Sequence, residues 1–298
     1  MKIFKLFSLL LFIFSNTLFA QGQREITVTT SKLTDQLYML VGQGGNIGLF
    51  VGDDGIFMVD AQYQHMTVKL KEAIGKISDK PIKFILNTHW HGDHSGGNEN
   101  FNQDQTVLVA HENVYKRMNS EQFNNEFNRK TPASPSGALP EITFTTDMTF
   151  NMGGETIMIF HVKNAHTDGD SMVYFPNNNV LHTGDVVFTN KYPFVDVSSG
   201  GNIDGYINAI KKVLPLINDD TKIIPGHREA TNKAELKEYL AMLEYIRKGV
   251  NDQITAGKSE EEVVGDASIT KKYDDLGYGD WFIKPETIRL LLYRSLKK

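Results

Sequence analysis

The 298-residue chain contains no cysteine. It therefore forms no disulfide, offers no thiolate to a metal and has no cysteine on which a lipid anchor could be built. Any metal site must use imidazole and carboxylate groups. Any argument for export must rest on the N-terminal segment alone.

A basic block is also missing. The 31 lysine and arginine residues face 36 acidic residues, which gives a net charge of −5. Proteins that bind nucleic acid usually cluster basic side chains on one surface, so a nucleic-acid partner and a nuclease are disfavoured. The chain also contains no Gly-x-Ser-x-Gly, which disfavours a serine nucleophile. A small-molecule substrate is compatible with the lack of a basic block and of a Gly-x-Ser-x-Gly motif.

Long apolar runs are absent except near the N-terminus. Lys2 and Lys5 precede an apolar stretch over residues 6–14, and the segment becomes more polar towards Ala20. This layout is typical of a secretory signal peptide over residues 1–20 and is too short for a membrane span. We therefore expect an exported, periplasmic or secreted mature chain that has no membrane association after cleavage. Leu18 is large for a position three residues before a cut, so an uncleaved anchor is the alternative.

The most informative stretch is Asn-Thr-His-Trp-His-Gly-Asp-His, residues 87–94. It follows a short apolar run over residues 82–86, which is typical of a buried strand. In extended chain, residues two apart point to the same side, so His89 and His91 can face one cation. Gly92 allows a change of direction that turns Asp93 and His94 towards a second position.

Imidazole and carboxylate without thiolate suit Zn²⁺ first, with iron or manganese as alternatives. The opposing interpretation is a polar turn that happens to be rich in histidine. Three histidines and an aspartate within six residues, directly after an apolar strand, favour the metal site.

Further groups of the same type stand at other predicted strand ends. His166 follows a strand over residues 157–162, Asp185 ends Val-Leu-His-Thr-Gly-Asp, and His227 follows Lys-Ile-Ile-Pro-Gly. Asp60 ends an apolar strand over residues 56–59. Each alone fits a solvated turn or a capping group. Their joint placement indicates a shared site, in which Asp60 orients a ligand or the ligand loop.

This combination of motifs resembles the metallo-β-lactamase superfamily of metallohydrolases over residues 37–227. The resemblance implies an α/β fold of the αββα four-layer type, with two mixed β-sheets face to face and helices on the outer faces. It also implies two zinc ions per chain. The first would be held by His89, His91 and His166, and the second by Asp93, His94 and His227, with Asp185 bridging both.

The identity of residue 185 leaves the substrate open. In the best-known antibiotic-degrading members this position holds a cysteine ligand or a non-bridging residue. Esterases, thioesterases, lactonases and many other hydrolases of the superfamily place a bridging aspartate there, as this chain does with Asp185. A β-lactam, a lactone and an ester all remain candidate substrates.

The expected activity is cleavage of an acyl C–N or C–O bond by a metal-bound hydroxide. Asp93, a metal ligand beside the nucleophile, is the residue expected to orient it and to move its proton. The alternatives are a phosphodiesterase or an iron-dependent redox enzyme of the same superfamily, and a zinc-binding protein without turnover.

Residues 186–201 are expected to form a long loop near the site. Lys191, Tyr192 and Arg228 are candidate substrate contacts, and Phe188 and Phe194 are candidate walls of an apolar pocket. Packing in the core is an equally good interpretation of the aromatic residues. The four other histidines, at positions 65, 111, 161 and 182, are interpreted as structural or solvated.

The remaining pattern predicts one domain over residues 21–298 with a helical extension from about residue 231. Helices are expected over residues 66–77, 112–130, 202–214, 233–248 and 285–296, with Gly249 as a C-terminal cap. Residues 131–140 are rich in proline and are expected to link two sheet-forming halves, the second starting at Ile142. The aromatic segment 273–281 has no assigned place, and the sequence predicts no oligomeric state.

Overall fold

The computed structural model describes residues 26–102 and 106–297. The predicted signal peptide, residues 1–20, lies outside these ranges. Among the described residues, none of the helices is both long and apolar enough to span a membrane.

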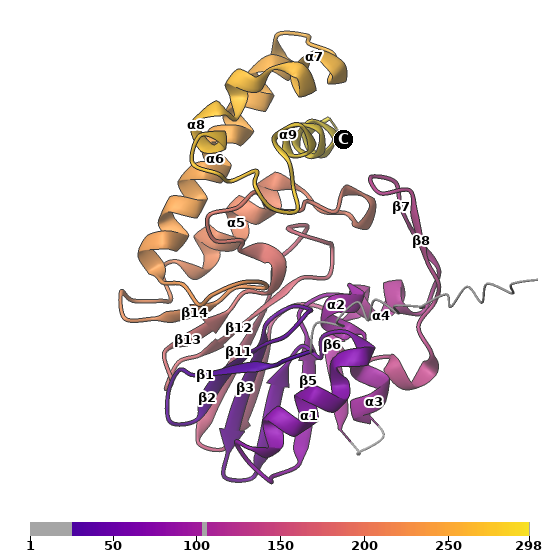
Figure 1. The fold of residues 1–298 in the computed structure, drawn as a ribbon, viewed down its shortest axis with the longest axis vertical. Coiled ribbons are helices and arrows are strands. Elements are labelled where there is room, and N and C mark those ends of the chain that lie inside the picture. Colours follow the sequence, from indigo (N-terminus) through magenta and orange to yellow (C-terminus); the bar gives the residue numbers. More distant parts are fainter. Residues whose placement is uncertain (1–25, 103–105, 298) are drawn as a thin grey trace, which may run out of the picture.

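Two β-sheets pack face to face (Figure 1). The first has seven strands in the order β1-β2-β3-β4-β5-β6-β9, antiparallel up to β4 and parallel from β4 onward. Its strands are β1 (Thr29–Lys32), β2 (Leu37–Val41), β3 (Ile47–Gly52), β4 (Gly55–Val59), β5 (Ile82–Asn87), β6 (Val107–His111) and β9 (Ile142–Phe144).

The second sheet has five strands in the order β10-β11-β12-β13-β14. Only the last pair of this sheet, β13 with β14, is parallel. Its strands are β10 (Met148–Met152), β11 (Glu155–His161), β12 (Ser171–Phe175), β13 (Val180–His182) and β14 (Lys222–Ile224).

Apolar side chains fill the space between the sheets. Phe50 and Phe57 of the first sheet meet Phe175 of the second, with ring centroids 5.9 and 6.5 Å apart. Successive residues of β3 and β4 are buried, and since side chains alternate along a strand, the outer face of the first sheet is covered as well. Helices α1 (Thr67–Gly75) and α3 (Asn98–Asn102) cover the first sheet, and α5 (Ile203–Val213) and α6 (Lys233–Thr255) cover the second (Figure 1). The predicted four-layer sandwich is confirmed.

The boundary between the halves differs from the prediction. β9 pairs with β6 and so belongs to the first sheet, although residues from 142 onward were expected to open the second. The crossing falls between β9 and β10. The predicted linker, residues 131–140, is packed instead of free: Ser134 N–H donates to Met118 O at 2.7 Å, and Ala138 is buried.

The predicted helix over residues 112–130 is mostly wrong. Helix α4 (Glu112–Met118) is followed by a hairpin of β7 (Gln122–Asn124) and β8 (Arg129–Thr131). The Asn124 side chain accepts a hydrogen bond from Phe127 N–H at 2.9 Å, and Asn128 has φ 49°. Asparagine side chains that bond to nearby backbone favour turns over helices. The hairpin extends towards the C-terminal helices (Figure 1).

The C-terminal segment is helical, with one predicted boundary wrong. α6 runs past Gly249, which packs so close to Ile269 that an added Cβ would lie 3.0 Å from Ile269 Cγ2. The glycine therefore serves helix packing, and the left-handed residue after the helix is Gly257, with φ 80°. α7 (Glu260–Gly265), α8 (Lys271–Asp274) and α9 (Pro285–Leu296) complete the chain.

Candidate metal centre

The His-rich stretch leaves β5 at Asn87 and enters the short helix α2 (Gly92–Ser95). His89 and His91 lie in extended chain before the helix, whereas Asp93 and His94 lie in its first turn. Gly92 begins the helix, and an added Cβ would meet nothing within 4 Å. The change of direction therefore comes from the start of the helix, not from a conformation that requires glycine.

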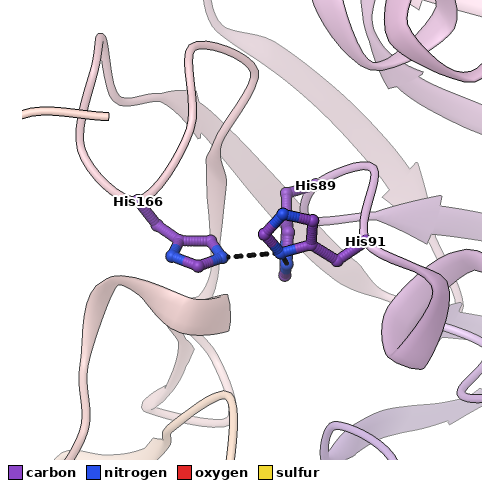
Figure 2. A group of neighbouring side chains, drawn as sticks. All are labelled: His89, His91 and His166. Atoms are coloured by element: carbon purple, nitrogen blue, oxygen red, sulfur yellow. Dashed lines mark hydrogen bonds between the residues drawn. The ribbon is translucent and has the colours of Figure 1, made fainter. Parts of the chain in front are cut away.

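Three histidines form the first group (Figure 2). His89 Nε2 lies 3.1 Å from His91 Nδ1, and His91 Nδ1 lies 2.9 Å from His166 Nε2. His89 and His166 are buried, and His91 is half-buried. Figure 2 shows the three rings approaching one another from two separate parts of the chain.

The second group contains Asp93, His94, Asp185 and His227. His227 Nε2 lies 3.3 Å from Asp93 Oδ2 and 3.4 Å from His94 Nε2. The candidate ligand atoms of this group all lie within 4.8 Å of one another. The structure therefore brings together all seven residues that the sequence singled out as metal ligands.

Asp185 lies between the two groups. Its Oδ2 faces the first, at 3.6 Å from His166 Nε2 and 3.9 Å from His89 Nε2. Its Oδ1 faces the second, at 3.0 Å from His94 Nε2 and 3.4 Å from His227 Nε2. This is the placement that a bridging carboxylate requires.

The donor set fits two cations. Asp185 Oδ1 is buried and has no hydrogen-bond partner within the described part of the chain. A buried carboxylate oxygen without a partner is costly, and a cation at this point would satisfy it. The ligands are imidazole nitrogens and carboxylate oxygens, the set that zinc, iron and manganese accept.

Two glycines let the backbone approach the ligands closely. A Cβ on Gly226 would lie 1.9 Å from Asp185 Oδ1, and a Cβ on Gly45 would lie 2.1 Å from His94 Cε1. Gly45 belongs to the connection between β2 and β3, and Gly226 precedes the ligand His227. Both glycines are therefore part of the walls of the site, a role that the sequence analysis did not assign.

Asp60 orients one ligand and its loop. It is fully buried, and its Oδ2 lies 2.7 Å from His94 Nδ1. The carboxylate also accepts hydrogen bonds from Thr88 N–H at 2.7 Å and Thr88 Oγ1 at 2.8 Å. Asp60 itself adopts φ 66°, a left-handed conformation that few residues other than glycine adopt. Such bonds to the far nitrogen of a ligand histidine fix the direction of the ring.

Two further residues hold ligand rings and were missed by the sequence analysis. Asp196 Oδ2 lies 2.9 Å from His91 Nε2. His166 Nδ1 lies 2.6 Å from Phe194 O and 3.2 Å from the Tyr206 hydroxyl. Asp196 falls in the predicted loop 186–201 but matches no motif, and Tyr206 resembles any apolar-face residue of an amphipathic helix. Only the fold identifies them.

The charges in the two groups differ. Burial and the neighbouring His91 lower the pKa of His166 to about 4, and burial also lowers the pKa of His89. In the second group burial opposes protonation, but Asp185 outweighs it and raises the pKa of His227 to about 9. The pKa of His94 is raised for the same reason. The carboxylates thus make the second group the more attractive to positive charge.

Comparison with known proteins supports this assignment. Residues 40–227 match the family model described as the metallo-beta-lactamase superfamily, a range that contains all seven candidate ligands. The chain belongs to the metallo-β-lactamase superfamily. Members of this superfamily are mostly metal-dependent hydrolases, although some have other activities.

One relative and two solved structures resemble this superfamily member at low sequence identity. The metallo-beta-lactamase IND-1 of Chryseobacterium indologenes is 24% identical over 63% of this chain and 74% of its own length. A metallo-beta-lactamase structure from Pontibacter korlensis has a TM-score of 0.61 at 19% identity, covering 73% of this chain and 99% of its own. The sec-alkylsulfatase Pisa1 from Pseudomonas sp. has a TM-score of 0.66 at 16% identity, covering 90% of this chain and 50% of its own. At these identities the structural likeness establishes the fold alone.

Of the three candidate substrate contacts in this metallo-β-lactamase fold, two bond to the C-terminal segment and one is partly exposed. Tyr192 is buried, and its hydroxyl donates to Asp274 Oδ1 at 2.7 Å. Lys191 Nζ donates to Gly277 O at 2.6 Å. Both side chains are thus engaged with the C-terminal segment and do not stand free for a substrate. Arg228 follows the ligand His227 and is partly exposed, with φ 73°.

The aromatic residues of the same loop lie against the ligands. Phe188 stacks on His227 with ring centroids 5.9 Å apart, and Phe194 stacks on His91 at 6.1 Å. Both are buried. They pack in the core and also form the inner boundary of the site, so the two interpretations of these residues are compatible.

The four other histidines lie outside the two ligand groups. His182 is fully buried, with Nε2 3.1 Å from Asn46 O, while its Nδ1 accepts a hydrogen bond from Gly184 N–H at 3.2 Å. His111 and His161 stack on each other at 3.7 Å. His65 is exposed and lies 2.8 Å from Gln43 Oε1. These contacts support the structural or solvated roles expected for them.

Proposed function

We propose that the protein is an exported dinuclear zinc hydrolase that cleaves an acyl C–N or C–O bond in a β-lactam, a lactone or an ester. The observation that carries this proposal is the position of Asp185, whose two oxygens face two separate ligand groups. Asp185 offers one oxygen to each group, so each cation would have four protein donor atoms, and a water would take the fifth position that zinc can accept in catalytic sites. Room for water is the mark of a catalytic zinc site as opposed to a structural one.

When bound, the two zinc ions would polarise an acyl carbonyl and lower the pKa of water from about 15.7 to about 7. The surrounding residues would supply orientation. His94 and His227 outweigh the effect of burial and lower the pKa of Asp93 to about 2, so this carboxylate is ionised at neutral pH. Asp93 can therefore accept a hydrogen bond from the attacking water, orient it and take part in moving its proton.

Export and zinc are supported by sequence chemistry. The N-terminal segment has the layout of a signal peptide, and imidazole with carboxylate suits zinc before iron or manganese. With residues 1–20 removed, 29 basic residues face 36 acidic ones, a net charge of −7. We therefore propose a small-molecule substrate, no nucleic-acid partner and no membrane association of the mature chain.

The test combines metal analysis of the purified mature chain with a hydrolysis panel. The panel contains a chromogenic cephalosporin, an acyl-homoserine lactone, a nitrophenyl ester and bis-nitrophenyl phosphate. Two zinc ions per chain with turnover of any of the first three substrates supports the proposal. Turnover of the phosphate diester alone would assign a phosphodiesterase.

Two other outcomes would also overturn the proposal. Iron in the centre together with oxygen-dependent chemistry would assign a redox member of the superfamily. Zinc at full occupancy without turnover of any substrate would favour a zinc-binding protein that has no catalytic activity.

A further inference from the structure

Four aromatic side chains from three parts of the chain meet beside the metal centre. They are Phe127 at the tip of the β7–β8 hairpin, Phe194 in the loop after Asp185, and Trp281 with Phe282 before α9. Phe127 lies 5.1 Å from Phe194 and 5.4 Å from Phe282, measured between ring centroids. Phe282 lies 5.8 Å from Phe194 and 6.3 Å from Trp281. We call this set the aromatic wall.

The aromatic wall contacts both ligand groups. Phe194 stacks on His91 of the first group at 6.1 Å. Trp281 lies 5.7 Å from His227 of the second group. Phe282 contacts both of these wall residues, so the wall runs without a break past the two proposed cation positions.

The outer part of the aromatic wall is open to solvent. Phe282 is 53% exposed and Phe127 is 44% exposed, whereas Phe194 beneath them is only 8% exposed. Single exposed apolar residues are common, but exposed aromatic rings that touch one another beside a polar cluster are typical of ligand-binding surfaces. Because Phe282 and Phe127 remain about half exposed, they contribute little to the hydrophobic core.

The segments that carry the aromatic wall are fixed in place. Lys191 Nζ donates to Gly277 O at 2.6 Å, and Tyr192 N–H donates to Tyr278 O at 3.3 Å, which ties the segment before Trp281 to the loop after Asp185. On the hairpin, Asn124 Nδ2 donates to Asp196 Oδ1 at 3.1 Å. Asp196 in turn contacts the ligand His91. A surface held in this way needs little ordering when a ligand binds.

We propose that the aromatic wall binds an apolar alkyl or aryl group that the substrate carries next to its scissile acyl bond. This inference rests on the proposed hydrolase function and narrows its substrate class to amphiphilic acyl compounds. Trp281 and Phe282 lie beyond residues 40–227, the range that matches the family model. The C-terminal extension therefore supplies two of the four rings of the wall, and Phe127 and Phe194 within the matched range supply the others.

The expected effect follows from burial of methylene groups. Each methylene moved from water to an apolar surface changes the binding equilibrium about fourfold. Across p-nitrophenyl acetate, butanoate, hexanoate and octanoate, kcat/KM of the zinc-loaded protein should rise about two- to fourfold per methylene, mainly through KM. The rise should level off once the chain extends past the aromatic wall.

The decisive variant is Phe282→Ser, with Phe282→Leu as its conservative counterpart. Phe282 is exposed, so neither change should unfold the protein. Phe282→Ser should flatten the dependence of kcat/KM on chain length, and Phe282→Leu should retain most of that dependence. The control is Phe123→Ser on the same hairpin. Phe123 is 52% exposed and makes no ring contact within the described ranges, so it should leave the dependence unaltered.

A binding measurement separates this inference from the hydrolase proposal. Calorimetric titration of the same proteins with butanoate, hexanoate, octanoate and decanoate needs no turnover. Affinity that increases with chain length in wild type and Phe123→Ser, but not in Phe282→Ser, supports the wall even if no ester is cleaved. Ester turnover with no dependence on chain length would overturn the wall and leave the hydrolase proposal standing. A dimer that Phe282→Ser dissociates, without any dependence on chain length, would also overturn it and assign the wall to contact between copies.

Discussion

At the scale of single residues, the centre is defined by carboxylates that each serve two partners. Asp185 faces both ligand groups, Asp60 holds His94 and the backbone at Thr88, and Asp196 holds His91 and the Asn124 amide. All three are buried, where an unpaired negative charge would be strongly unfavourable. Positive charge beside these carboxylates, from cations or from protonated imidazoles, therefore stabilises the folded state.

The ligand assignment predicts the behaviour of two variants. His91→Ala removes a ligand of the first group, and Asp93→Ala removes a ligand of the second together with the proposed water-orienting carboxylate. Neither side chain is deeply buried, so both variants should keep the melting profile of a folded protein but lose more than about 100-fold in kcat. The measurement is steady-state turnover alongside circular dichroism. His65→Ala, at an exposed histidine outside the centre, is the matched control, and normal turnover in either ligand variant would refute the assigned roles.

The pKa shifts give a second prediction, for the metal-free protein. Asp185 raises the pKa of His227 to about 9 and also raises the pKa of His94, so both rings should carry an extra proton at pH 7. Burial keeps the pKa of His166 near 4, so that ring should be neutral. Because a cation must displace the protons, zinc affinity should increase with pH up to about 9. Nitrogen-15 NMR of the histidine rings after chelation checks this directly, and a neutral His227 at pH 7 would contradict it.

At the scale of elements, the ligands follow from the ends of strands. His89 and His91 come after β5, His166 after β11, Asp185 after β13 and His227 after β14. Since β13 and β14 are parallel, the residues that follow them meet at one edge of the sheet. An apolar run followed by metal-type residues is visible in a sequence. The strand ends were therefore predictable, and so was the cluster.

Other elements were not predictable because tertiary contacts decide them. The segment after Met118 has helix-compatible composition but forms a hairpin held by Asn124 and by contacts to the loop at Ser198. Gly249 has the residue type of a helix cap but lies inside α6 against Ile269. Partners such as Asp196 and Phe282 carry no local signal, because their meaning depends on which distant segment lies beside them.

The loop backbone at Gly226 packs directly against the ligand Asp185, so its replacement should disturb metal binding. A Cβ on Gly226 would lie 1.9 Å from Asp185 Oδ1, so Gly226→Ala should displace the bridging carboxylate. We expect loss of bound metal and of turnover while the sheets still form. Gly75→Ala, at the end of α1 with nothing within 4 Å of its added Cβ, is the control and should keep full metal content. The metal content of both proteins is measured. A Gly226→Ala protein that still binds two metal ions would contradict this prediction.

At the scale of the molecule, each ligand group joins the two halves of the sandwich. His89 and His91 belong to the first half and His166 to the second. Likewise Asp93 and His94 come from the first half, whereas Asp185 and His227 come from the second. A cation in either group would thus connect the sheets at the edge where their strands end.

Removal of metal should therefore lower stability. A ligand that binds only the folded state raises the free energy of unfolding by about 4 kcal/mol when its concentration is 1,000 times its dissociation constant. We expect chelation to lower Tm by several degrees and zinc to restore it. Scanning calorimetry with and without chelator measures the difference. The difference in Tm should be smaller for His91→Ala than for the wild type. A wild-type Tm that does not change with chelator would argue against metal as a link between the halves.

The whole arrangement depends on two cations, which we place on either side of the Asp185 carboxylate. Crystals of the zinc-loaded protein, measured at the zinc absorption edge, locate bound zinc without reference to activity. We expect two anomalous peaks, one among His89, His91 and His166 and one among Asp93, His94 and His227, with an Asp185 oxygen beside each. A single peak, or peaks away from these side chains, would contradict it.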